Sequence, residues 1–393
     1  MGIRERMSGN EAVAHAIKQV NPDVMAAFPI TPSTEIPQMV STFIANGEID
    51  TEFIPVESEH SSMSATMGAC AAGARAITAT SSCGLAFMWE VLYVAASDRL
   101  PVVMAVVNRA LTGPININCD HSDSMGARDS GWLQIYAETN QEAYDNYIQS
   151  FLIAEHPDVR LPMMVCQDGF ITSHAVMNIE LIEDEKVKNF VGTYNPENYL
   201  LNADMPMAIG PYANSPFYME TKMNQRIAMK NAKKVILEVA KEFEKISGRK
   251  YGLFEEYKMD DAEYAIVIMG SAAGTTKDAV DALRAEGIKA GMIKIRVFRP
   301  FPGEELAAAL SKVKAVAILD RAESFSGQGG PVGSELKAAL MDAGVSAKAV
   351  NYFYGLGGRD YTVGDAEKVY RNLIDMTENG KKLEQFKYIG LRK

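Results

Sequence analysis

Glu59 is the residue whose type and position most directly suggest chemistry. It follows a short apolar strand and opens a helix of very small residues, in the segment FIPVESEHSSMSATMGACAAG at residues 53–73. Small residues let a helix approach neighbouring backbone, so we expect this first-turn acid in a tight, partly dry cleft that could hold a cofactor ring. Burial would make the carboxylate an effective proton partner. The alternative is that Glu59 only complements the helix dipole.

Other polar residues follow apolar runs that are typical of buried strands. The run 24–28 is followed by Thr31, the run 74–80 by Cys83, the run 100–107 by Arg109, and the run 161–166 by Asp168. Apolar runs of this length, separated by helical stretches, predict βα units and a parallel sheet. Ligands of such sheets bind outside the carboxyl ends of the strands. We therefore predict that Thr31, Glu59, Cys83 and Arg109 lie at one site.

Length and composition indicate a globular protein of about two or three domains, with 393 residues of which 47% are hydrophobic and 23% charged. The formal charge of −11 disfavours nucleic acid as a partner, because phosphate binding needs a basic surface. No stretch approaches the ~20 apolar residues of a membrane span, and the start MGIRERMSGNEAV lacks the apolar core of a signal peptide. We expect a cytoplasmic protein.

The cysteines argue against a metal centre in this chain. Cys70, Cys83, Cys119 and Cys166 are widely separated and form no C-x-x-C pair or Cys/His spacing. We therefore expect neither an iron–sulfur cluster nor a structural zinc site here. Cys70 and Cys166 lie in apolar runs and are expected to be buried thiols.

A long amphipathic helix divides the chain. Apolar residues recur at three and four positions over residues 226–246, after an irregular crossing predicted for 194–218. A glycine-containing stretch at 247–252 ends this helix and a new strand follows. We therefore predict one domain at 1–252, which includes the crossing and the helix, and a smaller α/β domain at 253–393.

The second half repeats the α/β rhythm. Predicted strands are 264–269, 291–297, 315–319 and 348–352, and predicted helices include 304–313, 332–341 and 365–376. Glycine-rich turns at 270–276 and 326–330 match neither the P-loop nor the dinucleotide fingerprint, so tight turns are favoured over phosphate sites. The turn at 355–360 is similar, except that Arg359 adds a possible anion contact.

Several strings carry a resemblance to a known family. They are AFPITPST at 27–34, VESEHS at 56–61, NRAL at 108–111, ARDSGWLQIYAETNQEAYD at 127–145, VFRPFP at 297–302 and GLGGRD at 355–360. Together they resemble the alpha subunit of the multi-subunit 2-oxoacid:ferredoxin oxidoreductases, with pyruvate:ferredoxin oxidoreductase as the nearest member. The resemblance implies two α/β domains with parallel sheets. The first would be of the thiamine-diphosphate pyrimidine-binding type, and the second similar to the transketolase C-terminal domain.

The resemblance also implies cofactors and partners. Thiamine diphosphate would be shared with a partner subunit that supplies the Mg²⁺ site, because Gly364-Asp365-Ala366 is the nearest string to the family's G-D-G motif and does not match it. Coenzyme A would be a co-substrate, and [4Fe-4S] clusters would lie in partner subunits of beta, gamma and delta type. Ferredoxin would accept the electrons.

The resemblance assigns roles to individual residues. Glu59 would hydrogen-bond the pyrimidine N1′ of the cofactor, with Glu57 as the rival acid. Thr31 would meet the substrate near its carboxylate, and Arg109 would pair with that carboxylate. Further cofactor contacts are expected from Pro29, Ile30 and Cys83.

Alternatives remain for these positions. Thr31 could instead cap a helix, and Arg109 could form a surface ion pair. Cys83 stands where relatives usually carry glutamine. This exchange either changes the pocket or has no consequence, and the sequence leaves both alternatives open. The polar loop at 116–123 could contact substrate or coenzyme A, but a solvated loop is favoured, and His121 lacks the spacing of a metal ligand.

The expected reaction is oxidative decarboxylation of pyruvate to acetyl-CoA and CO₂ with reduction of ferredoxin. A branched-chain 2-oxoacid such as 2-oxoisovalerate is the alternative substrate, because the two acids differ only in an apolar group. A non-catalytic scaffold subunit is a further alternative, which the joint presence of Thr31, Glu59 and Arg109 disfavours.

Overall fold

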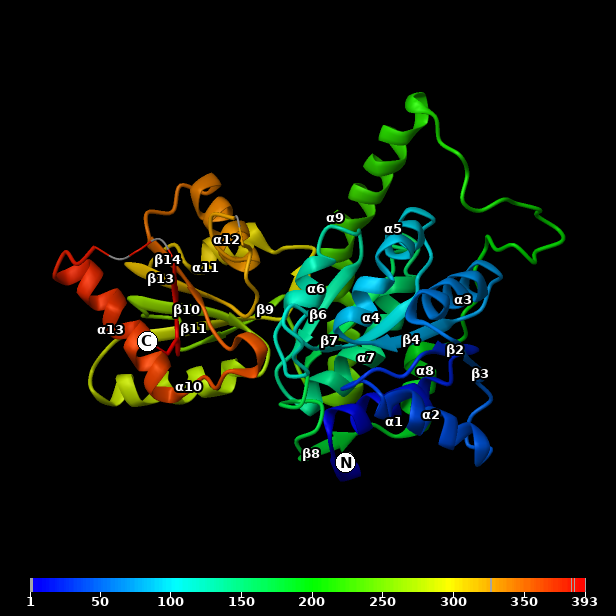
Figure 1. Cartoon of the computed structure of the whole chain (residues 1–393), viewed down its shortest axis with the longest axis horizontal. Helices are drawn as coiled ribbons and strands as arrows, with labels where there is room; N and C mark the ends of the chain where they lie inside the picture. Colours follow the sequence, from blue (N-terminus) through cyan, green and yellow to red (C-terminus); the bar gives the residue numbers. More distant parts are fainter. Residues whose placement is uncertain (1–2, 326, 383, 385, 393) are drawn as a thin grey trace.

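The computed structural model describes residues 3–325, 327–382, 384 and 386–392. Ser326, in the second predicted glycine-rich turn, lies outside the described residues. The chain forms two α/β units side by side, each built on its own sheet (Figure 1). No helix of the described part is long and apolar enough to cross a membrane.

The first sheet is almost wholly parallel and has the strand order β12-β6-β7-β5-β4-β2-β3. Its parallel strands are β2 (Val24–Ala27), β3 (Glu52–Pro55), β4 (Ala76–Thr80), β5 (Val103–Asn108), β6 (Leu133–Ala137) and β7 (Met163–Asp168). The four apolar runs of the first half therefore correspond to β2, β4, β5 and β7. Since neighbouring parallel strands end at the same edge, the residues after β2, β4 and β5 lie together.

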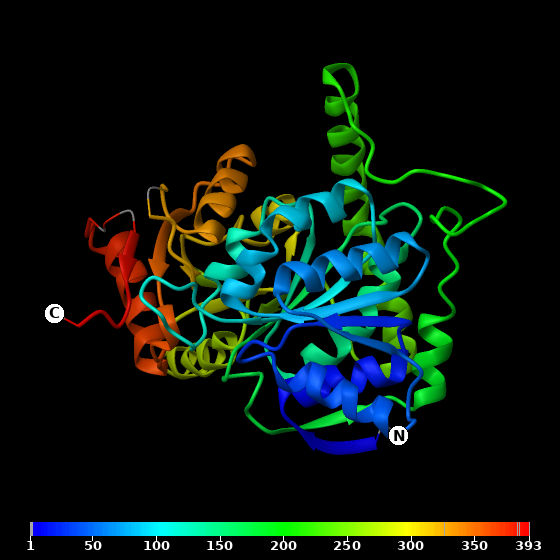
Figure 2. The same ribbon diagram turned by 45° about the vertical axis from the view of Figure 1, so that its right-hand side comes forward.

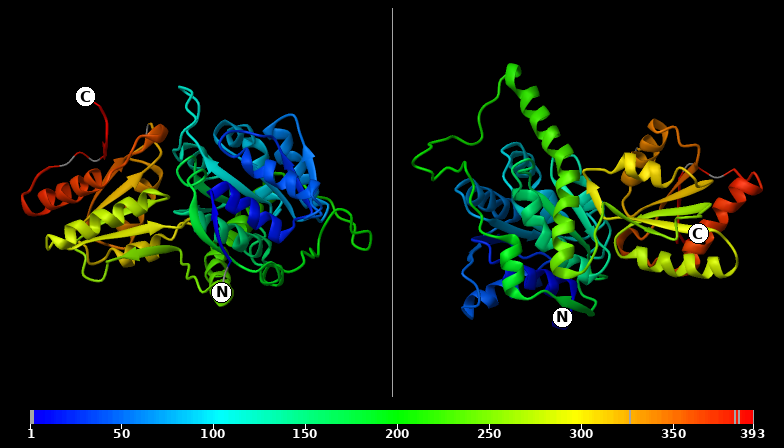
Figure 3. Two further views of the ribbon diagram at one scale, coloured as in Figure 1. Left: turned by 90° about the horizontal axis from the view of Figure 1, so that it is seen from below. Right: turned by 180° about the vertical axis from the view of Figure 1, so that it is seen from behind.

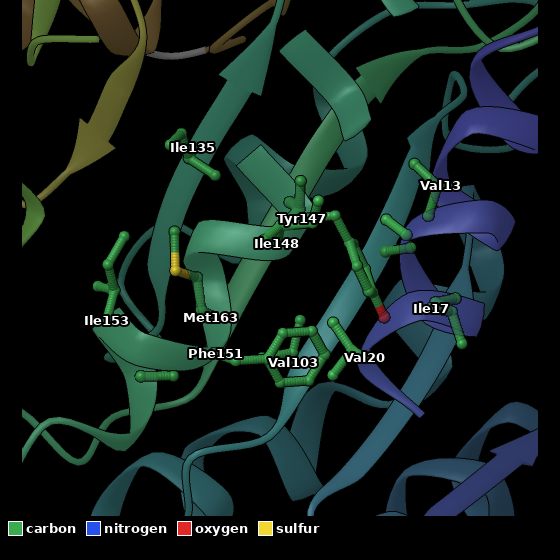
Figure 4. Packing of buried hydrophobic residues seen from close by; sticks show 14 of the residues in the cluster. Val13, Ile17, Val20, Val103, Ile135, Tyr147, Ile148, Phe151, Ile153 and Met163 are labelled. Atoms are coloured by element: carbon green, nitrogen blue, oxygen red, sulfur yellow. The ribbon is translucent and has the colours of Figure 1, made fainter. Parts of the chain in front are cut away.

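Helices cover both faces of this sheet. One face packs against α1 (Gly9–Val20), α7 (Asn140–Glu155) and α9 (Ser215–Ser247), with Ile17, Tyr147 and Phe151 fully buried (Figure 4). A capping box of Ser8 and Glu11 starts α1. The other face carries α3 (Glu59–Ala71), α4 (Ser82–Phe87) and α5 (Trp89–Ser97). Smaller elements of this unit are β1 (Ile3–Met7), α2 (Glu35–Ala45), α6 (Ser122–Gly126), β8 (Met177–Leu181) and α8 (Asp184–Val191).

The second sheet has the order β15-β14-β13-β10-β11-β9. Its strands are β9 (Phe254–Tyr257), β10 (Tyr264–Met269), β11 (Ala290–Ile295), β13 (Ala315–Asp320), β14 (Lys348–Phe353) and β15 (Phe386–Tyr388), all parallel except β9. The helices of this unit are α10 (Ala272–Ala285), α11 (Gly303–Ala309), α12 (Pro331–Asp342), the short η1 (Leu356–Gly358) and α13 (Val363–Glu378). This is the predicted α/β fold class with two mainly parallel sheets, and β1 and β8 add a two-stranded antiparallel pair.

The prediction of one strand over residues 291–297 is wrong. The chain divides there into β11 and β12 (Val297–Arg299), and β12 pairs antiparallel with β6 of the first sheet. The cause lies at Arg296, whose buried guanidinium donates to Asn146 Oδ1 and Gln149 Oε1 on α7. These bonds hold the chain against the first unit, so the strand cannot continue in the second sheet.

The prediction for the long helix was too short. Helix α9 begins at Ser215 rather than near residue 226, so the irregular crossing ends at residue 214. Asn214 is the N-cap and a proline occupies the first turn, where its missing N–H costs no helical hydrogen bond. The first turns of α9 project from the body of the molecule, which the turned views also show (Figures 2 and 3). Strand β12 comes from the second part of the chain but joins the first sheet, so the domain division at residue 252 stays a proposal.

Candidate functional site

Arg109 and Thr31 are brought together at the carboxyl ends of β5 and β2. The Arg109 side chain is largely buried, and its Nη1 donates to the Thr31 carbonyl oxygen at 2.9 Å while its Nε donates to the Asn116 carbonyl oxygen at 3.0 Å. Arg109 forms no ion pair within the described part of the chain, so the surface ion-pair alternative is wrong. Its Nη2 and the Thr31 hydroxyl have no hydrogen-bond partner among the described residues, and both are free to bind a ligand.

Thr31 does not cap a helix. Helix α2 starts at Glu35 with Thr34 as its N-cap residue, and the loop before it is closed by Ser33, which donates to the Ile30 carbonyl oxygen at 2.8 Å. Pro29 is exposed and Ile30 half-buried at the same loop. The structure therefore places the loop predicted to contact the cofactor beside Arg109.

Glu59 is the first residue of α3 and is only 9% exposed. Ser58 precedes it as the N-cap, and the Ser58 hydroxyl accepts from the Ser61 amide. The Glu59 carboxylate makes no hydrogen bond or ion pair with any described residue. A buried carboxylate without a partner is costly, so this group is suited to a ligand that donates to it.

Gly84 of α4 packs directly against Glu59. A Cβ atom at position 84 would lie 2.5 Å from Thr80 Oγ1 and 2.9 Å from both Cγ and Oε1 of Glu59. These distances are too short for any side chain, so the glycine sets the position of the carboxylate. The site is thus formed by α3, the end of β4 and the start of α4.

Gly84→Ala is expected to displace the Glu59 carboxylate and to slow a reaction that depends on it about a hundredfold, as for a misplacement of about 1 Å at a reacting group. The measurement is the steady-state rate with every ligand of the site in excess. Gly68→Ala is the matched control, because a Cβ there meets nothing within 4 Å. Equal activity of the two variants would contradict the role given to Gly84.

Burial separates Glu59 from its rival Glu57. Glu57 is exposed, and its carboxylate already accepts a hydrogen bond from the Ser61 hydroxyl, which lowers its pKa. An exposed acid that is stable as the anion is a poor proton partner. The geometry therefore favours Glu59.

Cys83 lies in the first turn of α4, partly buried, with its Sγ 2.9 Å from Thr112 Oγ1. Burial by itself would raise the pKa of this thiol. Hydrogen bonding with Thr112 and the charge of Arg109 lower it by more, so the pKa falls below its ordinary value. Cys83 adjoins Gly84 in sequence and therefore lies next to the Glu59 pocket. The four predicted residues thus lie along one edge of the first sheet.

Asp123 ends the loop 116–123, which the sequence offered as a possible ligand contact, but its own role at the site was not predicted. Its buried Oδ2 accepts from the backbone amides of Ser82 at 2.9 Å and Arg109 at 3.0 Å, and its Oδ1 accepts from Asn108 Nδ2 at 2.8 Å. One carboxylate therefore joins the start of α4 to the end of β5. No sequence signal could have found it, because these partners lie 41, 14 and 15 positions away.

The prediction of a solvated loop at 116–123 is correct for Ile117 and Asn118, which are exposed, and wrong for most of the residues after them. Cys119, Asp120, His121 and Asp123 are buried, since the loop packs between the two units. His121 Nε2 lies 2.7 Å from Asp168 Oδ1. His121 therefore has an acidic neighbour in the folded chain, although no such residue lies at a metal-ligand spacing from it in the sequence.

Two groups of side chains have the geometry of metal ligands. One consists of Cys119, His121 and Asp168, and the other of Glu138, Glu142 and Glu255. Arg321 Nη1 already pairs with Asp168 at 2.9 Å, and Lys294 Nζ already pairs with all three glutamates. A protein cation therefore already occupies each group, Arg321 at Asp168 and Lys294 among the three glutamates.

Two family models match the chain. "Pyruvate flavodoxin/ferredoxin oxidoreductase, thiamine diP-bdg" matches residues 15–241, which is more than half of the chain, and "Pyruvate:ferredoxin oxidoreductase core domain II" matches residues 262–366.

Curated relatives match over the whole length. The pyruvate synthase subunit PorA of Thermotoga maritima is 52% identical over 390 residues, covering 99% of this chain and 98% of the relative. The pyruvate synthase subunit PorA of Methanocaldococcus jannaschii is 45% identical, covering 98% and 97%. The ketoisovalerate oxidoreductase subunit VorA of Pyrococcus abyssi is 43% identical, covering 100% and 98%.

Solved structures support the fold. The 2-oxoglutarate:ferredoxin oxidoreductase of Magnetococcus marinus, bound to 2-oxoglutarate, coenzyme A and succinyl-CoA, aligns with a TM-score of 0.72 at 21% identity. The alignment covers 94% of this chain and 65% of that one, so this chain spans about two thirds of its length. A split-gene transketolase, described as an inactive beta4 tetramer, aligns with a TM-score of 0.55 at 11% identity, covering 95% and 99%.

Proposed function

The chain belongs to the pyruvate flavodoxin/ferredoxin oxidoreductase family, and from this membership we propose that it is the alpha-type subunit of a pyruvate:ferredoxin oxidoreductase. The reaction converts pyruvate and coenzyme A to acetyl-CoA and CO₂, and two electrons pass to ferredoxin. The identity of 52% to a pyruvate synthase subunit, against 43% to a ketoisovalerate oxidoreductase subunit, favours pyruvate over a branched-chain acid.

One observation carries the proposal: the buried Glu59 carboxylate has no partner in the described chain and is closed in by Gly84. This geometry fits the aminopyrimidine ring of thiamine diphosphate, whose N1′ would donate to Glu59 when protonated. The cofactor, when bound, supplies the nucleophilic carbon and the electron sink for decarboxylation. Glu59 holds the proton at N1′, and its burial keeps the carboxylate away from bulk water.

Arg109 and Thr31 are proposed to hold the substrate. Two bonds from Nη1 and Nε to backbone carbonyl oxygens fix the Arg109 guanidinium, which leaves Nη2 for a carboxylate. The Thr31 hydroxyl, on the neighbouring loop that follows β2, can donate to a second oxygen. Pro29, Ile30 and Cys83 are proposed to line the cofactor side of this pocket.

The remaining parts of the enzyme are proposed to lie in partner subunits of beta, gamma and delta type, in the cytoplasm. These partners would supply the Mg²⁺ and diphosphate site and the [4Fe-4S] clusters, and ferredoxin would accept the electrons. The relatives' names as subunits support an assembly. Asp365, in the nearest string to a G-D-G motif, instead closes a capping box with Thr362 at the start of α13.

The proposal is tested by cofactor retention. The chain mixed with its beta-type partner is expected to retain thiamine diphosphate through gel filtration, and Glu59→Ala is expected to lose it. Glu57→Ala is the matched control, since that acid is exposed and bound to Ser61. Full retention by the Glu59 variant would refute the role of Glu59, and no retention by the unaltered chain would favour a scaffold subunit.

A further inference from the structure

A cavity of about 280 Å³ lies between the two units, and neither Glu59 nor Gly84 is among its lining residues. Its walls include Phe170 and Ile171, which follow β7 of the first sheet, and Ser271 and Arg321, which follow β10 and β13 of the second. The cavity therefore lies at the carboxyl ends of strands from both sheets. This is where parallel α/β proteins bind ligands.

The charges at the walls of this cavity balance, although the protein is acidic. The charged lining residues are Arg321, Arg359 and Asp360, and the Asp168 carboxylate pairs with Arg321, so these four charges cancel while the whole chain has −11. A charge-balanced cavity does not repel an anion as a negatively charged surface does.

Arg321 is built into the cavity wall. Its side chain is 5% exposed, and its Nη1 donates to Asp168 Oδ2 at 2.9 Å and to Ser271 Oγ at 3.4 Å. Its Nη2 has no hydrogen-bond partner among the described residues. Arg321 Nε also donates to the Gly355 carbonyl oxygen at 3.4 Å, so the guanidinium is fixed through Nε and Nη1, and Nη2 remains available to a ligand.

Arg359 supplies a second guanidinium. It is exposed at the cavity mouth and forms no ion pair within the described ranges. Thr275, in the first turn of α10, adds a hydroxyl to the same wall, and Phe170 and Tyr361 add aromatic surface. Two guanidinium groups and a hydroxyl around one small space match a phosphate group.

We propose that this cavity binds a small phosphate ester through Arg321 and Arg359. The volume corresponds to about nine non-hydrogen atoms when each takes the space of a water molecule, which is close to the roughly ten of glycerol 3-phosphate. The inference does not rest on the proposed function.

The cavity is connected to the candidate site by one loop. Gly358 N donates to the Cys119 carbonyl oxygen at 2.7 Å, and His121 N donates to the Arg321 carbonyl oxygen at 2.8 Å. The same loop begins at Arg109, so the phosphate ester lies at the other end of the segment that holds the substrate arginine.

Isothermal titration of the full chain with glycerol 3-phosphate tests the proposal. One binding site is expected, and Arg359→Gln is expected to weaken binding roughly tenfold or more, as for a lost charge-assisted hydrogen bond. Thr275→Phe fills the cavity without changing its charge and is expected to abolish binding. Arg226→Gln, an exposed arginine on α9 without an ion pair in the described part, is the charge-matched control and should bind normally.

Coenzyme A distinguishes the two sources of a phosphate ester. If coenzyme A competes with glycerol 3-phosphate, its own phosphate occupies the cavity; without competition, the occupant is a free metabolite. No binding by the unaltered chain would overturn the proposal. Undiminished binding by both Arg359→Gln and Thr275→Phe would also overturn it.

Discussion

Glu59→Gln is expected to lower 2-oxoacid-dependent electron transfer by the assembled enzyme by about three orders of magnitude, within the range of ~10²–10⁴ typical for loss of a positioned acid–base group. The amide keeps the shape of the side chain but cannot exchange a proton with N1′. The measurement is turnover of the complex at saturating cofactor.

Two controls make this result specific. The unfolding free energy should change little, because Glu59 has no partner in the described chain whose loss would destabilise the fold. Glu57→Gln should keep near-normal turnover, since that acid is exposed and its contact is with Ser61. If Glu57→Gln lost activity and Glu59→Gln kept it, the assignment would be reversed.

Asp123→Ala is expected to destabilise the chain by about 3–5 kcal/mol and to remove most activity. The change leaves the buried amides of Ser82, Arg109 and Ser124 without their acceptor, and each unsatisfied group costs about 1–3 kcal/mol. Chemical denaturation measures the first effect. A loss below about 1 kcal/mol would contradict this account of the carboxylate.

Asp123→Asn tests whether Asp123 positions the site as well as stabilising the fold. The new amide keeps one acceptor oxygen, and the buried Asn108 Oδ1, which has no partner among the described residues, can turn to accept from its nitrogen. We expect a smaller stability loss but a raised KM for the 2-oxoacid, because the Arg109 backbone is held less firmly. An unchanged KM would leave Asp123 with a structural role only.

Activity and stability should respond to pH in opposite directions at Asp123. Burial raises its pKa to about 6, against hydrogen bonds from Arg109 and Asn108. Because the folded pKa lies above the unfolded value near 3.9, this group's stabilising contribution is present below pH ~4 and is lost as pH rises through ~6, by at most about 3 kcal/mol.

Protonation also removes an acceptor from the amides of Ser82 and Arg109, so activity should fall as pH drops below 6. Asp320 is also buried with a pKa raised to about 6, so its contribution to stability has the same sign. The stability effect is therefore measured as the difference between the unaltered chain and Asp123→Asn. If the activity of Asp123→Asn still falls as pH drops below 6, the loss of activity at low pH is caused by another group.

Sequence reasoning recovered the parts of the fold that depend on local pattern. Apolar runs ending in polar residues predicted β2, β4, β5 and β7, and the strand 264–269 coincides with β10. Thr31, Glu59, Cys83 and Arg109 lie at one edge because parallel strands share their carboxyl ends. The family resemblance is confirmed by the family models and the relatives.

What the sequence could not supply depends on contacts between distant residues. The bonds of Arg296 to α7 divide a continuous apolar run into β11 and β12, and no local pattern marks that division. In the polar loop at 116–123, residues 119–121 are buried because residues of the second unit bond to them, although the composition is typical of a solvated loop. Gly84 resembles an ordinary helix residue until Glu59 is seen 2.9 Å from its missing Cβ.

Reduction of a low-potential viologen dye by the native complex, with coenzyme A, tests the central claim most directly. Pyruvate, 2-oxoisovalerate, 2-oxoglutarate and an aryl 2-oxoacid are compared by kcat/KM. The account predicts the highest value for pyruvate, dependent on thiamine diphosphate and lost in Glu59→Gln. A higher value for another acid would contradict the proposed substrate, and no reduction with any of the four would contradict the proposed enzyme.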